Sequence, residues 1–113
     1  MTYDTPTDLF AALRTAWSAK SSSSWTPQNP AKGQCSVTSL VVQDIFGGEI
    51  LSIRTPGGTH FYNKINGVRW DLTVSQFAAP IPFEDTQSSR DEAFGDTGPE
   101  QYAQLRNALG LNS

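Results

Sequence analysis

The sequence of 113 residues is 37% hydrophobic and 11% aromatic, which is typical of a compact domain and argues against disorder along the whole length. Its formal net charge of −3 and the scatter of its eight basic residues argue against binding to nucleic acid. Because the longest apolar run is too short to span a bilayer and no segment resembles a signal peptide, we expect a single domain over residues 1–113 with no membrane partner.

The segment DTPTDLFAALRTAW (residues 4–17) predicts an N-terminal helix. Thr5 or Thr7 can cap this helix, and Pro6 is tolerated in its first turn. One apolar stripe at helical spacing is formed by Leu9, Phe10, Leu13 and Trp17. A polar loop with two prolines follows over residues 21–34.

A second helix is predicted to begin at Cys35, directly after a glycine-containing loop. Its apolar residues recur at three- and four-residue steps, which indicates a helix that buries one face. These residues are Val37, Leu40, Val41, Ile45 and Phe46. The pair Gly47-Gly48 ends the helix, as glycine commonly does.

Three antiparallel strands are predicted from the segments EILSIRT (49–55), THFYNKI (59–65) and VRWDLTV (68–74). The dipeptide Asn66-Gly67 between the last two segments is the strongest short signal for a hairpin. With these two residues in the turn, Asn63 faces Trp70 and Tyr62 faces Asp71.

The C-terminal third of the chain is less regular in pattern. Thr73-x-x-Gln76 resembles a capping box for a short turn that ends near Phe77. Residues 78–97 are acidic and contain prolines, which predicts an irregular loop or a lid that would favour a cationic ligand. A final helix is predicted over residues 99–109 with Thr97 as its cap. The predicted fold is therefore α+β, with helices packed on a small antiparallel sheet.

Cys35 is the only cysteine in the chain, so no internal disulfide can form, and a free thiol favours the cytoplasm. A helix N-terminus stabilises a thiolate, because its unpaired N–H groups and the helix dipole favour a negative charge. The same N–H groups can stabilise the oxyanion that forms when a thiolate attacks a carbonyl. The alternative is that Cys35 is a small buried apolar residue.

The predicted strands bring a histidine and a carboxylate to one face. His60 and Tyr62 share a sheet face because side chains alternate, and Asp71 faces Tyr62 across the hairpin. A carboxylate there can hold one imidazole nitrogen and turn the other toward a thiol, as in a nucleophilic triad. Each residue also has a structural alternative: a lone histidine is usually structural, and Asp71 can simply end a strand.

The chain resembles the YunG-like family of small bacterial proteins in the segments SSSSWTPQNPAKGQCSVTSLVVQDIFGGEI, GGTHFYN and WDLTVSQF, which extend over roughly residues 17–77. More broadly, a cysteine at a helix start followed by a histidine and an aspartate on strands resembles papain-like and transglutaminase-like enzymes. The resemblance implies a minimal papain-like core with Cys35, His60 and Asp71 as the catalytic set. It implies no established substrate.

An amide side chain upstream of the cysteine would complete the oxyanion hole of such an enzyme. Asn29 is the first candidate and Gln34 the second, although either can equally be a loop amide bonded to backbone. Trp25 is a candidate wall of the substrate cleft, and Trp70 a candidate neighbour of the histidine, with core packing as the alternative for both. No cofactor is expected, and one histidine with one cysteine provides too few soft ligands for a metal.

The sequence therefore predicts a cofactor-independent cysteine enzyme that acts on an amide, ester or thioester in a small-molecule or peptide-like substrate. The acyl group would form a covalent intermediate with the thiol and would then be transferred to water or to an amine. Two other interpretations remain open: a non-catalytic module that binds a ligand or partner, and a redox-sensing thiol.

Overall fold

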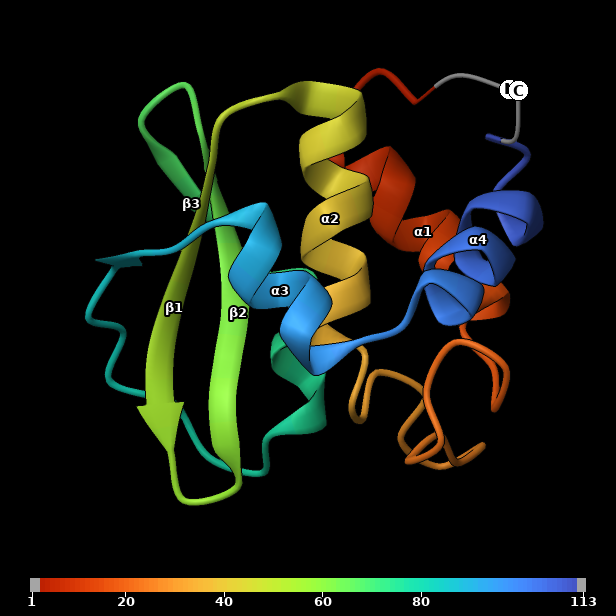
Figure 1. Cartoon of the computed structure of the whole chain (residues 1–113), viewed down its shortest axis with the longest axis horizontal. Helices are drawn as coiled ribbons and strands as arrows, with labels where there is room; N and C mark the ends of the chain where they lie inside the picture. The colour runs from red at the N-terminus through yellow and green to blue at the C-terminus, as the bar shows by residue number, and fades with distance from the viewer. Residues whose placement is uncertain (1–2, 112–113) are drawn as a thin grey trace.

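A computed structural model describes residues 3–111 of the chain. The elements in chain order are α1 (Pro6–Ala16), α2 (Cys35–Phe46), β1 (Glu49–Thr55), β2 (Gly58–Ile65), β3 (Val68–Trp70), the 3₁₀ helix η1 (Val74–Gln76), β4 (Thr86–Gln87), α3 (Arg90–Asp96) and α4 (Pro99–Ala108). The strands form an antiparallel sheet in the order β3-β2-β1-β4 (Figure 1). The predicted α+β class is confirmed.

Helix α2 lies at the centre, with the sheet on one side and α1 and α4 on the other (Figure 1). Leu40 packs with Ile50 and Phe61 of the sheet, whereas Val41 packs with Leu9 of α1. Eight consecutive residues, 35–42, are buried. The prediction that α2 buries one face is therefore wrong for residues 35–42, which are buried around the whole circumference, whereas Asp44 in the last turn is exposed.

Most of the predicted helix boundaries are confirmed. The Thr5 hydroxyl caps α1 by accepting a hydrogen bond from the Asp8 backbone N–H. Helix α2 begins at Cys35 and ends before Gly47, as predicted. The cap of α4 is Gly98, however, because Thr97 instead ends the preceding helix α3.

The hairpin between β2 and β3 has the predicted register up to Asn63, which pairs with Trp70. The predicted pairing of Tyr62 with Asp71 is wrong, because β3 ends at Trp70 and the chain leaves the sheet. As a result, the first half of β2 lacks a strand neighbour on this edge within residues 3–111. The chain that follows β3 fills this space.

The prediction that residues 78–97 are irregular is wrong for two parts of the segment, since β4 pairs with β1 and α3 forms a two-turn helix. Before β4, the chain crosses the face of the sheet opposite α2, where Ile81 and Phe83 pack against Leu51, Ile53 and Tyr62 (Figure 1). No helix among residues 3–111 has the length and apolarity needed to cross a membrane.

The crossing segment is fastened to the sheet at Asp85. Its carboxylate accepts hydrogen bonds from the Arg69 guanidinium at 2.8 and 2.7 Å and from the Tyr62 hydroxyl at 2.9 Å. The Arg69 guanidinium also lies 4.5 Å from the ring centre of Phe83. A two-pronged ion pair between a guanidinium and a carboxylate fixes geometry better than a single contact.

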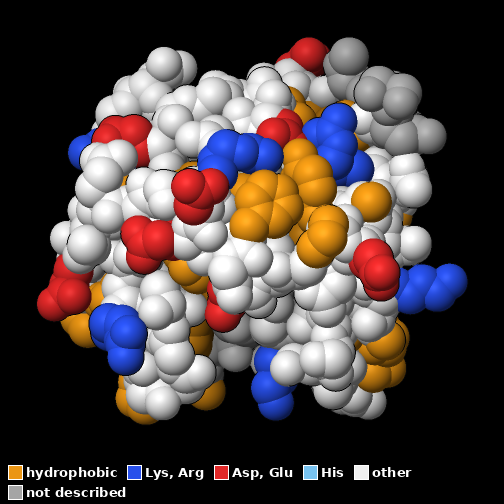
Figure 2. All heavy atoms as spheres, viewed as in Figure 1, with side chains coloured by type: hydrophobic (Ala, Val, Ile, Leu, Met, Phe, Trp, Pro, Cys, Tyr) orange, Lys and Arg blue, Asp and Glu red, His pale blue; other side chains and the backbone are white. Residues whose placement is uncertain are grey.

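Helices α3 and α4 are held on α2 by an ionic and aromatic cluster. Asp44 of α2 pairs with Arg90 at 3.1 Å and with Arg106 at 2.8 Å. The rings of Phe94 and Tyr102 pack edge to face with centres 5.1 Å apart. On this face of the molecule, apolar side chains gather between basic and acidic ones (Figure 2).

Replacement of Leu40 by alanine is expected to lower the free energy of unfolding by about 2–5 kcal/mol, because Leu40 is fully buried between α2 and the sheet and its loss leaves a cavity. Urea unfolding followed by circular dichroism measures the change. Val68→Ala is the control, because Val68 is 53% exposed, and it should cost less than about 1 kcal/mol. Equal losses in the two variants would contradict the central position of α2.

Candidate active site

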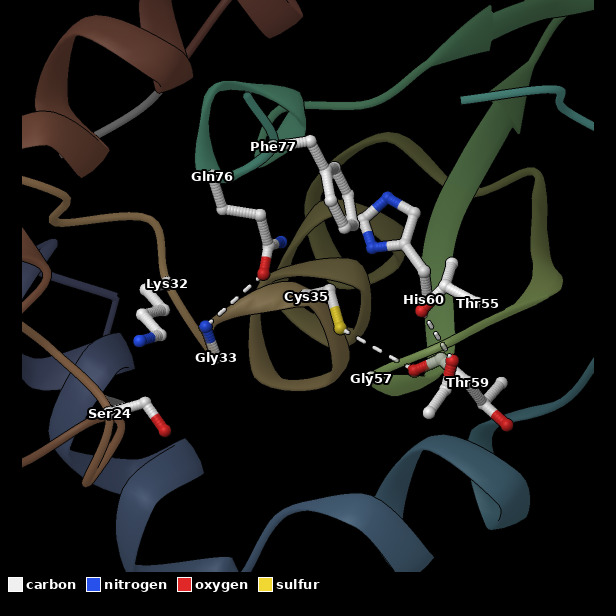
Figure 3. Close-up of a pocket in the computed structure, with 11 residues that line it drawn as sticks. Ser24, Lys32, Gly33, Cys35, Thr55, Gly57, Thr59, His60, Gln76 and Phe77 are labelled. Atoms are coloured by element: carbon white, nitrogen blue, oxygen red, sulfur yellow. Dashed lines mark hydrogen bonds between the residues drawn. The ribbon is translucent and has the colours of Figure 1, made fainter. Parts of the chain in front are cut away.

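Cys35 and His60 line the same pocket, which has a volume of about 260 Å³ (Figure 3). The pocket lies at the N-terminal end of α2. Its other walls come from the loop before α2, the turn between β1 and β2, and the end of η1. The molecular surface is hollowed here, between that loop and that turn (Figure 2).

Cys35 is the first residue of α2 and is 8% exposed. Its thiol lies 4.0 Å from the Thr59 carbonyl oxygen and is directed toward it. The N-cap residue Gln34 provides no side-chain hydrogen bond to the helix. The first backbone N–H groups of an α-helix have no partner within the helix, so this end of α2 presents donors and a positive dipole end beside the sulfur.

The imidazole of His60 is held on one side and unpaired on the other. Its Nε2 lies 2.6 Å from Asp71 Oδ2, whereas its Nδ1 is buried and has no hydrogen-bond partner among residues 3–111. The Phe77 ring packs edge-on against the imidazole at 4.7 Å between ring centres, and Tyr62 stacks on it at 5.9 Å. With His60 only 2% exposed, its orientation is set by protein contacts.

The pKa of His60 is raised from its ordinary value of 6.5 to about 9. Burial has the largest single effect and lowers this pKa, since it disfavours the charged ring. The hydrogen bond to Asp71, the nearby Cys35 side chain and the negative charge of Asp71 together outweigh burial. His60 is therefore an imidazolium at neutral pH.

Asp71 has a second role besides holding the imidazole. Its other carboxylate oxygen, Oδ1, accepts hydrogen bonds from the Thr73 backbone N–H at 3.1 Å and from the Thr73 hydroxyl at 3.3 Å. These bonds form the turn that leads into η1. Because η1 carries Gln76 and leads to Phe77, Asp71 also positions two residues that line the pocket.

The sequence interpretation missed Gln76 and Phe77 as pocket residues. Gln76 bridges two segments, because its Oε1 accepts from the Gly33 backbone N–H at 3.3 Å and its Nε2 donates to the Thr73 hydroxyl at 3.1 Å (Figure 3). The expected turn at this position is present, but the Gln76 side chain does not close a capping box with the Thr73 backbone. In the sequence, the only indication that these residues line a pocket was their chemical type, an amide side chain followed by an aromatic ring.

Gly33 is required where the loop meets α2. Its φ of +74° lies in the left-handed region, and a Cβ there would come within 2.4 Å of the Ser22 hydroxyl oxygen. A larger residue would displace Ser22 and Ser24 and so alter the loop wall of the pocket.

The predicted oxyanion and cleft residues are not brought to this pocket. Asn29 lies against a different hollow and donates its amide to the Gln76 carbonyl oxygen at 3.1 Å. The Gln34 side chain is fully buried and donates to the Ser18 carbonyl oxygen at 3.4 Å. Trp25 packs against the core between α1 and α2, and so does Trp70, whose predicted place beside His60 is taken by Tyr62 and Phe77.

The charged groups that line the pocket are basic. Lys32 and His60 line it, and no aspartate or glutamate does. The acidic segment, which was expected to act as a lid and favour a cationic ligand, packs on the far face of the sheet and over α2 and contributes no carboxylate to this pocket. Among residues 3–111, no three histidine, cysteine or carboxylate side chains are grouped in a way that could hold a metal ion.

Comparison with known proteins identifies one protein family. The family model described as YunG protein matches residues 5–112. The protein named "Uncharacterized protein YunG" from Bacillus subtilis (strain 168) is 54% identical over 97 residues, which cover 86% of this chain and 84% of the relative. No solved structure matches the chain significantly.

A nuclear magnetic resonance titration of the imidazole should give a pKa near 9, and His60 is the only histidine, so its ring signal is unambiguous in a protein without a histidine tag. In Asp71→Asn the pKa should fall by roughly one unit or more, because the amide keeps the bond to Thr73 but removes the negative charge. Asp85→Asn, which removes a carboxylate that contacts Tyr62, should leave the pKa unchanged. A wild-type pKa at or below 6.5 would refute the charged pair.

The stability of the fold should depend on pH through His60. Because the pKa is higher in the folded state, the stabilisation is complete below about pH 6.5 and is lost as the pH rises through about 9. The difference in unfolding free energy between wild type and His60→Gln should therefore shrink by at most on the order of 3 kcal/mol over this interval, since each tenfold change in proton affinity corresponds to about 1.4 kcal/mol. Urea unfolding at several pH values measures it. A difference that stays constant with pH would count against the raised pKa.

Proposed function

We propose that this chain, which belongs to the YunG protein family, is a cofactor-independent cysteine enzyme that acts on an amide, ester or thioester through an acyl group bound to Cys35. Cys35 would be the nucleophile, His60 the acid and base, and Asp71 the residue that orients the imidazole. These proposed roles follow the plan expected of papain-like enzymes, with the nucleophile at the start of a buried helix. The chemistry needs a reduced thiol, in keeping with the predicted cytoplasmic location.

The observation that carries the proposal is the unpaired Nδ1 of His60. A buried ring nitrogen without a partner is costly, because it has lost its bonds to water and gained none in return. This nitrogen belongs to a ring that lines the pocket together with Cys35. A charged imidazole with one free N–H can pair with a thiolate and later give its proton to a substrate.

In the first step, the Cys35 thiolate forms a bond to the carbonyl carbon and the carbonyl electron pair moves to the oxygen. The resulting oxyanion is stabilised by the N–H groups at the start of α2, which need no reorganisation because the helix already orients them. The tetrahedral intermediate then collapses. The bond to the leaving group breaks as His60 gives that group its Nδ1 proton, which leaves an acyl thioester and a neutral imidazole.

In the second step, the neutral imidazole takes a proton from water or from an amine as that molecule attacks the thioester carbon. Cys35 leaves as a thiolate, and the imidazolium is formed again, so each group returns to its starting state. Asp71 holds Nε2 throughout and stabilises the imidazolium. Release to water makes the protein a hydrolase, and release to an amine makes it an acyltransferase.

4-Nitrophenyl acetate should acylate Cys35 and release nitrophenolate in a burst of about one equivalent, with the acetyl group found on Cys35 by mass spectrometry. Cys35→Ala should show no burst, and His60→Gln should be acylated roughly 10²- to 10⁴-fold more slowly, as expected for loss of a general acid and base. Asp85→Asn, outside the pocket, is the matched control and should behave as wild type.

Three outcomes would count against the enzyme proposal. Acetyl groups found on lysines at equal rates in wild type and Cys35→Ala would show only ordinary surface reactivity. Acylation of Cys35 at one rate in wild type and His60→Gln would show a thiol that the imidazole does not assist, and would favour a binding module. Reversible oxidation of Cys35 that is independent of His60 would favour a redox-sensing thiol.

A further inference from the structure

A second hollow adjoins the pocket that contains Cys35. It has a volume of about 480 Å³ and is lined by Arg54, Thr55, Pro56, Gly57 and the run from Phe77 to Pro82. Thr55, Gly57 and Phe77 also line the first pocket, so the two hollows share a wall and lie side by side. We refer to the second hollow as the proline groove.

Phe77 connects the two hollows. Its ring packs edge-on against His60 in the first pocket and is also part of the wall of the proline groove. A group bound to the Cys35 sulfur and extending past Phe77 would therefore enter the proline groove.

The proline groove is apolar along most of its wall. Pro56, Ala78, Ala79, Pro80 and Pro82 are exposed to solvent rather than packed into the core. Ile81 is half-buried because it also packs on the face of the sheet. A continuous apolar surface open to water gains free energy when an apolar group covers it.

The opposite end of the first pocket is polar. Ser24, Lys32 and Gly33 form that wall, so the apolar surface available to a group on the sulfur lies on the side of Phe77. The charged side chains are Lys32 and the His60 imidazolium in the first pocket and Arg54 in the proline groove. Neither hollow is lined by a carboxylate. A cationic group would meet only like charges there.

We propose that the acyl part of the substrate is an apolar, uncharged chain that lies in the proline groove past Phe77. This inference rests on the proposed function and assigns its substrate class. Ala79 and Ile81 are the residues that select the acyl group, and they take no part in bond making or breaking.

The experiment compares acylation of Cys35 in the full chain by the 4-nitrophenyl esters of acetic, butyric and hexanoic acid. The 4-nitrophenyl ester of 6-aminohexanoic acid serves as a cationic reagent of similar length. Each methylene moved fully out of water favours binding roughly fourfold. Because the proline groove is open on one side, we expect the second-order rate constant to rise about tenfold or more from the acetyl to the hexanoyl ester. The cationic ester should react no faster than the acetyl ester.

Ala79→Asp should remove most of the rise with chain length, because it places a charge on the apolar wall of the proline groove. Ala19→Asp is the matched control: Ala19 is also exposed and outside helices and strands, and it lines neither hollow. Ala19→Asp should retain the full rise. Circular dichroism confirms that both variants fold.

The outcomes separate the two proposals. Acylation of Cys35 at rates that do not depend on chain length, or a rise that survives Ala79→Asp, would overturn the assignment of the proline groove while the enzyme proposal stands. A cationic ester that reacts faster than the hexanoyl ester would also overturn it. Absence of acylation of Cys35 by every ester would overturn the proposed function and this inference with it.

Discussion

Eight consecutive residues at the start of α2 are removed from solvent, so the other elements have to surround this helix. The sheet covers one side through Ile50 and Phe61, and α1 and α4 cover the other. A helix enclosed in this way still ends in unpaired N–H groups. The N-terminal end of α2 opens into a pocket, and the first residue there is the only cysteine. The packing of the core thus determines where the candidate nucleophile lies.

The electrostatic balance at His60 depends on the same enclosure. Burial alone would make the ring neutral, and only the nearby Asp71 and Cys35 keep it charged. Asp71 in turn begins the turn into η1 through its bonds to Thr73. One carboxylate therefore links the charge of the imidazole to the position of Gln76 and Phe77 on the pocket wall. Loss of the Asp71 side chain would alter both the charge of the imidazole and the position of the pocket wall. Asp71→Asn keeps the bond to Thr73 and removes only the charge, so it separates the two effects better than Asp71→Ala.

Local patterns in the sequence predicted much of the fold and that Cys35, His60 and Asp71 lie near one another. The start of α2 at Cys35 followed from spacing, and the register as far as Asn63 and Trp70 followed from the turn residues. Asp71 does contact His60, although it does so from the chain beyond β3 and not as a strand neighbour.

Other features could not be predicted, because they depend on contacts between distant parts of the chain. The bond from Gly33 to Gln76 joins residues 43 positions apart, and no local signal indicates it. Asn29 was a candidate by its distance from Cys35 along the chain, yet the loop turns its amide to the Gln76 carbonyl. Helix α3 was missed for a different reason. Prolines and acidic residues suggested a loop, although Ser89 and Glu92 have the spacing of a helix start and the Ser89 hydroxyl caps the helix.

The ion pair between Arg69 and Asp85 is partly exposed to solvent, so dissolved salt weakens it, whereas the nearly solvent-free pair between His60 and Asp71 is screened far less. Dissolved salt therefore loosens the attachment of the segment whose earlier residues line the proline groove, and leaves the contact between the imidazole and Asp71 almost unaffected.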